Sequence, residues 1–212
     1  MSRELDRAFV RELRDVVEKA TEAYEEYEFG QALQLTESFF WNGLTDNFLE
    51  LVKRRARDEL DPEGRASAVA ALRLGLDVLL RLFAPVAPTI TEEVWSWAFA
   101  EEKGQPSIHA APWPSVEELA RIPAPDHAGS FRVACEAIGA VRKAKTEAGI
   151  ALGRPLRLCA LSGSREALRR VEPVLADVAA AANARRVDLR AVTEGEEGAA
   201  FAAEIEAGQV SW

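Results

Sequence analysis

Apolar residues recur at three- and four-residue steps along the first part of the chain, which is the spacing of one face of an α-helix. The first such stripe consists of Leu5, Phe9, Leu13, Val16, Val17, Ala20, Tyr24 and Tyr27. Gly30 is expected to end this helix. A second helix is predicted over about residues 31–59, with Phe39 and Phe48 facing inward and cationic side chains in its last turns, where they suit the helix dipole.

A third helix is predicted over about residues 65–83 and stops before Pro85. Residues 89–92 are Thr-Ile-Thr-Glu, the Thr-x-x-Glu spacing of a capping box, so we expect a fourth helix to follow through Phe99. A short capped segment is expected at residues 115–118. Four helices joined by short turns predict an antiparallel bundle.

The pattern changes in the second half of the chain. Residues 104–130 are rich in proline and are expected to form a connector. Helical periodicity returns over 130–148, and is followed by alternation typical of a strand at 155–161, a helical stretch at 165–182 and a second alternating stretch at 186–190. This order predicts a small β-α-β element, whose strands are parallel if the helix is a crossover.

The expected fold class is therefore mainly α, with an antiparallel helix bundle followed by a small α/β domain. We assign residues 1–126 to the bundle with its Pro-rich connector, 127–192 to the second domain, and 193–212 to an acidic tail. Two alternatives remain for the tail: poor order, or packing of Phe201 and Trp212 back onto the body.

Charge is distributed unevenly along the chain. Its formal net charge is -9, which argues against sequence-independent nucleic-acid binding and against DNA as a partner. Residues 1–126 carry 14 Lys and Arg against 24 Asp and Glu, whereas residues 132–190 carry 12 against 6. A surface that contacts phosphate is therefore expected to involve the second domain.

Several classes of function find no support in the residues. Apolar runs are too short to span a membrane, so we expect a cytoplasmic protein. Cys135 and Cys159 lack metal-ligand spacing and are expected to be buried, His109 and His127 are expected at the surface, and no metal site is expected. No Gly-x-Ser-x-Gly sequence or nucleophile–base constellation indicates a hydrolase.

Ordered sequence segments then point to a family. They are Asp6-Arg7, Tyr24 to Phe29, the run from Phe39 to Lys53, the run from Leu79 to Trp95, Ser107 to Pro114, Ala137 to Lys143, and Gly153-Arg154-Pro155. In this order and spacing, nearly the whole chain resembles the anticodon-binding region of valyl-tRNA synthetases, which are class I aminoacyl-tRNA synthetases. One departure is that Gly43, Thr45 and Asn47 are small or polar where the family has bulkier neighbours.

The resemblance implies a module that binds the anticodon arm of a valine-accepting tRNA and contributes to ATP-dependent ligation of valine. The sequence contains no His-x-Gly-His or Lys-Met-Ser-Lys-Ser element, so we expect no catalysis by this chain alone and no cofactor bound to it, with ATP used by a catalytic domain. We expect a monomer. The alternative is a helical protein-interaction module derived from a synthetase that has lost tRNA binding.

Candidate contacts to tRNA are aromatic residues for stacking on unpaired bases, cations for phosphates, and one acid. They are Trp41, Asp46, Phe48, Lys53, Arg54, Arg55, Arg57, Arg142, Lys143 and Lys145. For Trp41 we expect core packing, with base stacking as the alternative. For Asp46 and Glu50, four residues apart, we expect structural roles, with an acid/base pair as the alternative. A structural role for Asp46 includes holding an arginine inside the bundle. For the run from Lys53 to Arg57 we expect a solvated helix end, with contact to tRNA phosphates as the alternative.

Overall fold

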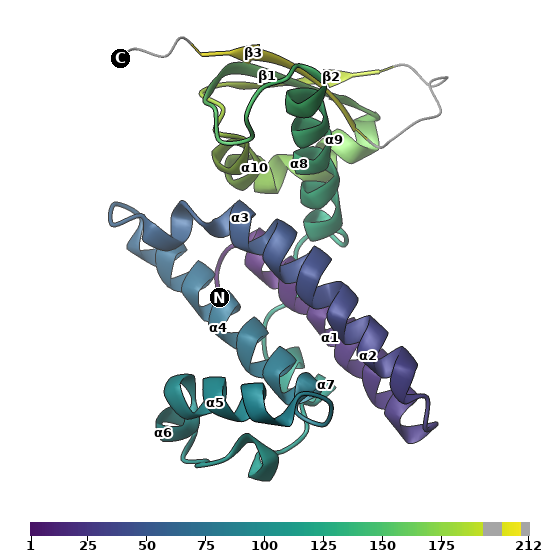
Figure 1. Cartoon of the computed structure of the whole chain (residues 1–212). Coiled ribbons are helices and arrows are strands. Elements are labelled where there is room, and N and C mark those ends of the chain that lie inside the picture. The colour runs from purple at the N-terminus through teal and green to yellow at the C-terminus, as the bar shows by residue number, and fades with distance from the viewer. Residues whose placement is uncertain (193–200, 209–212) are drawn as a thin grey trace.

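The computed structural model describes residues 1–192 and 201–208. Long helices form the lower part of the molecule and a small α/β unit lies above them (Figure 1). The lower helices are α1 (Glu4–Glu25), α2 (Phe29–Ser38), the π-helix η1 (Phe39–Phe48), α3 (Leu49–Val52), the 3-10 turn η2 (Arg55–Arg57), α4 (Pro62–Phe83), α5 (Pro88–Ala98), α6 (Ala100–Lys103), the 3-10 turn η3 (Ile108–Ala110) and α7 (Val116–Ala120). The expected fold class is confirmed.

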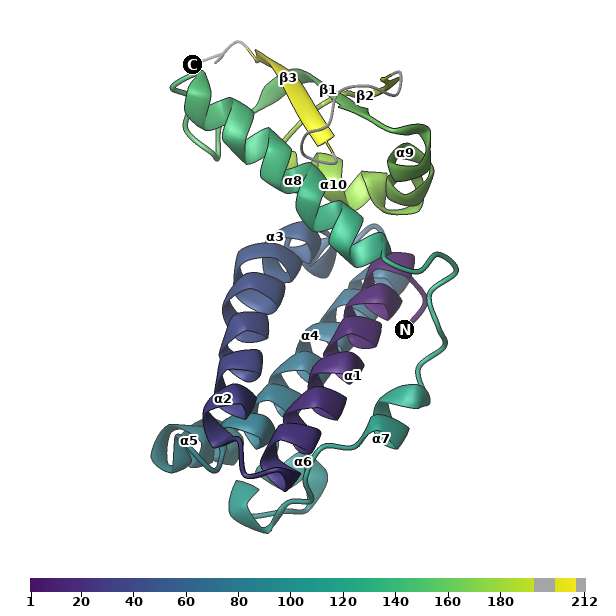
Figure 2. The same cartoon turned by 90° about the vertical axis from the view of Figure 1, so that its right-hand side faces the viewer.

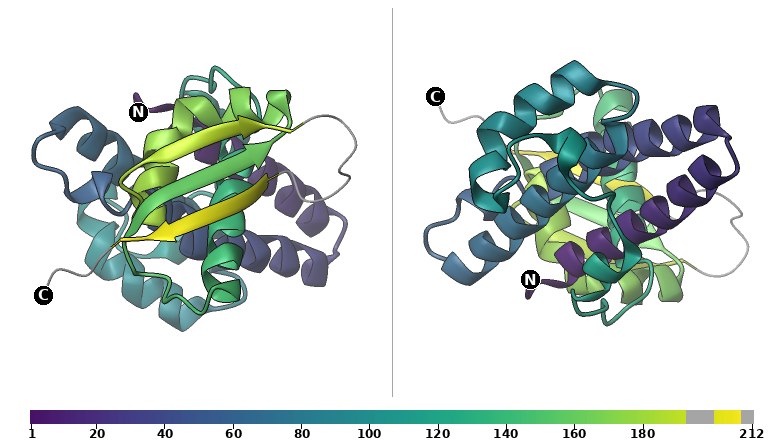
Figure 3. Two further views of the ribbon diagram at one scale, coloured as in Figure 1. Left: turned by 90° about the horizontal axis from the view of Figure 1, so that it is seen from above. Right: turned by 90° about the horizontal axis from the view of Figure 1, so that it is seen from below.

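The upper unit is built from a long helix and a β-α-β element. Its elements are α8 (Ser130–Glu147), β1 (Leu156–Gly163), α9 (Arg165–Val171), the 3-10 turn η4 (Glu172–Val174), α10 (Leu175–Ala182), β2 (Val187–Ala191) and β3 (Phe201–Ala207). β1 pairs with β2 in parallel, as predicted for a crossover, and the order of the sheet is β2-β1-β3. The three strands lie on the outside, with the helices beneath them (Figure 3).

Four boundaries differ from the predictions. Helix α1 ends at Glu25, and Gly30, which was expected to end it, lies in the first turn of α2. The helix predicted over 31–59 changes from α to π geometry at Phe39. Its last α-helical part, α3, ends at Val52. The helix predicted over 165–182 is interrupted at Glu172–Val174, where Pro173 cannot donate a backbone hydrogen bond. Part of the expected acidic tail forms β3, which pairs antiparallel with β1. Phe201 is buried, so this residue packs on the body; Trp212 lies outside the described residues.

The predicted capping box at Thr89 is wrong. Helix α5 begins one residue earlier, at Pro88, and its N-cap Ala87 has no side-chain hydrogen bond. Proline is favoured at the first helical position because its missing N–H would have no partner there. Glu92 instead accepts hydrogen bonds from Ser107 Oγ (2.9 Å) and the Ile108 amide (3.0 Å), which fastens α5 to the connector.

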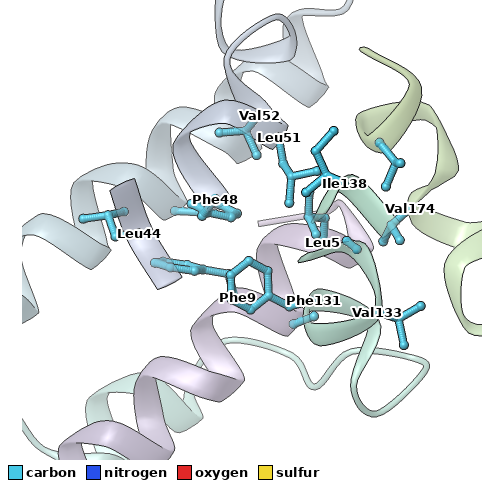
Figure 4. Close-up of a cluster of buried hydrophobic side chains, with 14 of the residues drawn as sticks. Leu5, Phe9, Leu44, Phe48, Leu51, Val52, Phe131, Val133, Ile138 and Val174 are labelled. Atoms are coloured by element: carbon cyan, nitrogen blue, oxygen red, sulfur yellow. The ribbon is translucent and has the colours of Figure 1, made fainter. Parts of the chain in front are cut away.

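One hydrophobic core runs through both parts of the molecule, across the expected boundary at residue 126. Phe9 of α1 stacks on Phe48 of η1 with 3.9 Å between ring centroids, and Phe131 of α8 packs edge-on against Phe9 at 5.6 Å. Figure 4 shows these rings beside Val174, which follows α9. A Cβ on Gly75 of α4 would lie only 3.0 Å from the ring of Phe9, so glycine favours the close approach of α4 to this ring.

A second, smaller core lies at the opposite end of the bundle. Helix α5 lies across the end of α4 (Figure 1), and its buried Trp95 packs with Phe99 and Leu80. The Trp95 indole donates a hydrogen bond to the Gln105 carbonyl over 2.9 Å, which satisfies its one polar group. This packing closes the lower end of the bundle.

Candidate functional site

A cleft of about 780 Å³ lies where the bundle meets the α/β unit. Figure 2 shows α3 on the bundle side of this junction, and α8 and α10 on the other. The bundle wall consists of Thr45, Asp46, Glu50, Lys53, Arg54 and Arg57, and the opposite wall of Ile138, Val141, Arg142, Lys145, Leu152, Gly153 and residues 180–183. One wall is therefore polar and charged, and the other contributes most of the apolar surface.

The cations of the bundle wall have different partners. Lys53 donates to Glu50 over 3.0 Å, so its charge is balanced by a neighbouring acid. Arg54 reaches across the cleft and donates from Nη2 to Asn183 Oδ1 over 2.6 Å. Arg57 is exposed and forms no ion pair with another residue in the described part of the chain. Arg54 and Arg57 therefore keep their charge available at the cleft.

The π-helix η1 is fastened to the opposite wall by Arg142 of α8. Its Nη2 donates to the Asp46 carbonyl over 2.6 Å, and its Nη1 donates to Asn47 Oδ1 over 3.0 Å. Within η1, Asn47 donates to the carbonyl of Asn42, five residues earlier, over 2.7 Å. The Asp46 carboxylate accepts no hydrogen bond within the described residues, so the expectation that it holds an arginine inside the bundle is wrong. It remains an open acceptor in the cleft.

The structure separates the two aromatic candidates. Trp41 is 59% exposed, so the expectation that it packs in the core is wrong and the stacking alternative stands. Phe48 is 0% exposed and stacked on Phe9, so no base can reach its ring. In a π-helix residues four and five apart lie on the same side, which places Trp41 on the side of Thr45 and Asp46. Thr45 and Asp46 line the cleft, whereas Trp41, one turn earlier, does not.

Arg55 is not available to RNA, although its neighbours are. Its guanidinium donates to both carboxylate oxygens of Asp6, each over 2.8 Å, and to those of Asp177 over 2.8 and 3.2 Å. Burial raises the pKa of Asp177, and Arg55 opposes that shift. Arg55 is thus a structural clamp between α1 and α10, and the phosphate role predicted for it is wrong.

Lys145 is likewise an internal residue. It is 1% exposed and its ammonium donates to the carbonyls of Leu152 (2.6 Å), Arg154 (2.9 Å) and Ala182 (2.9 Å). Burial lowers the pKa of Lys145. Lys143, two residues earlier, is exposed, lies outside the cleft and is 3.9 Å from Glu147. Neither lysine therefore offers its charge to RNA in the cleft. Lys145 instead holds together the backbone of the wall opposite the bundle.

The sequence analysis missed Asn183, which ends α10 in the left-handed conformation with φ of 54°. Asparagine is among the few residues that adopt this conformation readily. An asparagine directly after an apolar helical run is a known signal for a helix end, but the run itself gives no indication of the partner of its side chain. Only the fold brings Asn183 to Arg54.

Groups outside the cleft offer little reactivity. Burial raises the pKa of Cys135 to about 12 and that of Cys159 to about 11, so both thiols stay protonated at neutral pH. Within residues 1–192 and 201–208, no group of three or more His, Cys, Asp or Glu residues is placed to hold a metal. Over the same ranges, no helix is both long and apolar enough to cross a membrane.

Comparison with known families defines the class of protein. Residues 6–160 match the anticodon-binding domain of tRNA ligases. This match covers both walls of the cleft except residues 180–183. The chain belongs to the anticodon-binding domain family of tRNA ligases, and the resemblance expected from the sequence is confirmed.

Curated relatives narrow the comparison within that family. The chain is 48% identical over 148 residues to the valine–tRNA ligase of Thermobifida fusca (strain YX), an alignment covering 70% of this chain and 16% of that enzyme. It is 40% identical over 184 residues to the valine–tRNA ligase of Bifidobacterium longum (strain NCC 2705), covering 84% and 20%. For the valine–tRNA ligase of Methanothermobacter thermautotrophicus, the identity is 34% over 188 residues, covering 89% and 21%.

The chain thus spans about a fifth of the length of these relatives. It is an anticodon-binding domain homologous to that of valyl-tRNA synthetases, and the alternative of a protein-interaction module is not favoured.

Proposed function

We propose that the cleft between the bundle and the α/β unit binds the anticodon arm of a valine-accepting tRNA. The observation that carries this proposal is the clustering of Arg54, Arg57 and Arg142 around one 780 Å³ cleft in a chain of net charge -9. On an acidic surface, the attraction between a dispersed cation and RNA is offset by the carboxylates around it, whereas a concentrated group of cations attracts phosphate locally.

Each part of the cleft suits a different part of an RNA loop. Arginine N–H groups bind phosphate oxygens, and phosphate contacts fix the register of the RNA. Unpaired loop bases are recognised by stacking on aromatic rings and by hydrogen bonds to their edges. Asp46 offers an open acceptor beside the cations of the cleft, and Trp41 offers an exposed ring one turn earlier on the same side of η1.

The domain would contribute recognition, and not chemistry, to a larger ligase. We propose that valine and ATP are handled by a catalytic domain of the kind present in the relatives, that this chain binds no cofactor, and that it acts as a cytoplasmic monomer. The shares of 16% to 21% leave most of each relative's length for those activities.

Binding to valine-accepting tRNA across a salt series tests the proposal. We expect affinity to fall with salt, and the slope of log K against log salt to lose about 0.7–0.9 when Arg57→Gln removes one phosphate contact. Arg121→Gln, an exposed arginine of the connector, is the matched control and should leave the slope unchanged. Equal effects of the two variants, or no binding by the unaltered chain, would refute this assignment of the cleft.

A further inference from the structure

Three consecutive cations, Lys53, Arg54 and Arg55, follow α3 and have three different kinds of partner. Lys53 is paired with the Glu50 carboxylate, and Arg55 with two carboxylates. Arg54, between them, is bonded to the side-chain amide of Asn183, which carries no charge. Within residues 1–192 and 201–208, Arg54 is therefore the one cation of this run that is held in place while no carboxylate neutralises its charge.

Asn183 is itself fixed on every side. Its Nδ2 donates to the Gly153 carbonyl over 2.9 Å, and its own carbonyl accepts the Leu156 amide over 2.8 Å. Its backbone amide donates to the carbonyl of Ala180 at the end of α10. The oxygen that receives Arg54 therefore belongs to a side chain anchored to the loop before β1 and to the end of α10.

An anchored neutral acceptor has a specific effect on an arginine. It orders a long side chain in advance, which reduces the entropy lost when a ligand binds, and it leaves the full attraction between the guanidinium and an anion. A carboxylate in the same place would order the side chain and also compete with the anion. Arg54 has one described partner atom, so other N–H groups of its guanidinium remain for a phosphate oxygen.

We infer that Asn183 is a positioning residue for RNA binding: it holds Arg54 across the mouth of the cleft, charged and ready to contact a backbone phosphate. This inference rests on the proposed function of the cleft. It also assigns a role to the α/β unit, because the residue that orients a cation of the bundle comes from the end of α10.

The left-handed backbone at residue 183 permits a clean test. Glycine adopts this conformation without strain, so Asn183→Gly removes the side chain and keeps the turn. Asn183→Asp replaces the neutral acceptor by a charged one. Binding of the full chain to valine-accepting tRNA would be measured across a salt series for both variants, for Arg54→Gln, and for Asn183→Gly combined with Arg54→Gln.

We expect Asn183→Gly to weaken binding about three- to tenfold with an unchanged salt slope, because Arg54 keeps its charge but loses its order. Asn183→Asp should lower the slope by about 0.7–0.9, as Arg54→Gln does, because the charge is neutralised. In the Arg54→Gln background, Asn183→Gly should have no further effect. The same loss in both backgrounds would show that Asn183 acts only on the local structure and would overturn the inference.

The two proposals fail in different ways. If Arg57→Gln weakens binding but the effects of Asn183→Gly and Arg54→Gln simply add, the cleft stands and the positioning role of Asn183 is refuted. If the unaltered chain binds no tRNA, or the cleft variants have no effect, both the proposed function and this inference are refuted. Thermal unfolding of each variant identifies any that fails to fold, and Asn183→Asp then provides the second comparison.

Discussion

Replacing Arg55 by alanine is expected to be among the most destabilising single changes in this chain. The guanidinium donates to both oxygens of Asp6 and of Asp177 and also to the Gly64 carbonyl over 3.0 Å. Asp6 is 0% exposed and has one other side-chain partner, the Ser67 hydroxyl at 2.6 Å. Without Arg55, a buried carboxylate keeps its desolvation cost and loses the charge that offsets it.

Removing one partner of a buried ion pair costs about 3–5 kcal/mol. For a chain of this size that corresponds to a fall in Tm of roughly 6–20 °C. Asp177→Asn should cost less, about 1 kcal/mol, because burial already disfavours the charged form of Asp177 and Arg55 keeps its bonds to Asp6. The expected order of stability is therefore unaltered chain, Asp177→Asn, then Arg55→Ala.

Urea unfolding monitored by circular dichroism measures these differences. Arg57→Ala is the matched control, since Arg57 lies in the same turn but is exposed, and it should stay within about 0.5 kcal/mol of the unaltered chain. The stability of Arg55→Lys should fall between that of the unaltered chain and that of Arg55→Ala, because an ammonium keeps the charge but cannot span two carboxylates as a planar guanidinium does. A loss below about 1 kcal/mol for Arg55→Ala would refute the view that this clamp fastens α10 to the bundle.

Three further outcomes are expected. Lys145→Met should destabilise the fold by about 3 kcal/mol or more, because three backbone carbonyls lose their donor, whereas Lys143→Met should change stability by less than about 0.5 kcal/mol; equal values in urea unfolding would contradict the internal role of Lys145. Phe48→Ala should cost about 3–5 kcal/mol in the same assay, and a loss below about 1 kcal/mol would contradict its burial in the shared core. A hydrogen bond from Arg7 holds the pKa of Asp126 below its ordinary value. The ionised Asp126 carboxylate therefore stabilises the fold above its unfolded-state pKa, and this contribution is lost as pH falls through its lower folded-state pKa. Arg7→Gln should raise the Asp126 pKa in an NMR titration, and an unchanged pKa would exclude this cause.

Elements with strong local signals could be predicted from the sequence. Helix α8 and the two parallel strands follow their periodicity, and the capping box at Ser115 and Glu118 forms as expected because both partners lie within one turn. Strand β3 was missed because its acidic composition suggested a tail, although buried Phe201 and half-buried Ala203 and Ile205 alternate with exposed residues. For this segment, the two-residue alternation of side chains is a better indication of a strand than its acidic composition is of a tail.

The π-helix has a weaker signal that becomes clear only with the structure. Leu44 and Phe48 are buried and Phe39 packs against the same core, so the apolar spacing is five residues and then four. An α-helix would turn the residue five positions on away from that face. Gly43 permits this geometry, because a Cβ there would approach the ring of Phe39 to 2.9 Å.

The members of the site could not be chosen from sequence because their fates depend on distant partners. Arg54 and Arg55 are adjacent and chemically identical, yet Arg55 meets acids 49 and 122 positions away, while Arg54 meets an amide 129 positions away. Adjacent residues on a helical turn face different directions, so tertiary packing and not local propensity decides which cation is neutralised. The sequence thus indicated the helix end at which cations cluster, between Lys53 and Arg57. Only the position of α10 against that end distinguishes a structural arginine from one that remains available to a phosphate.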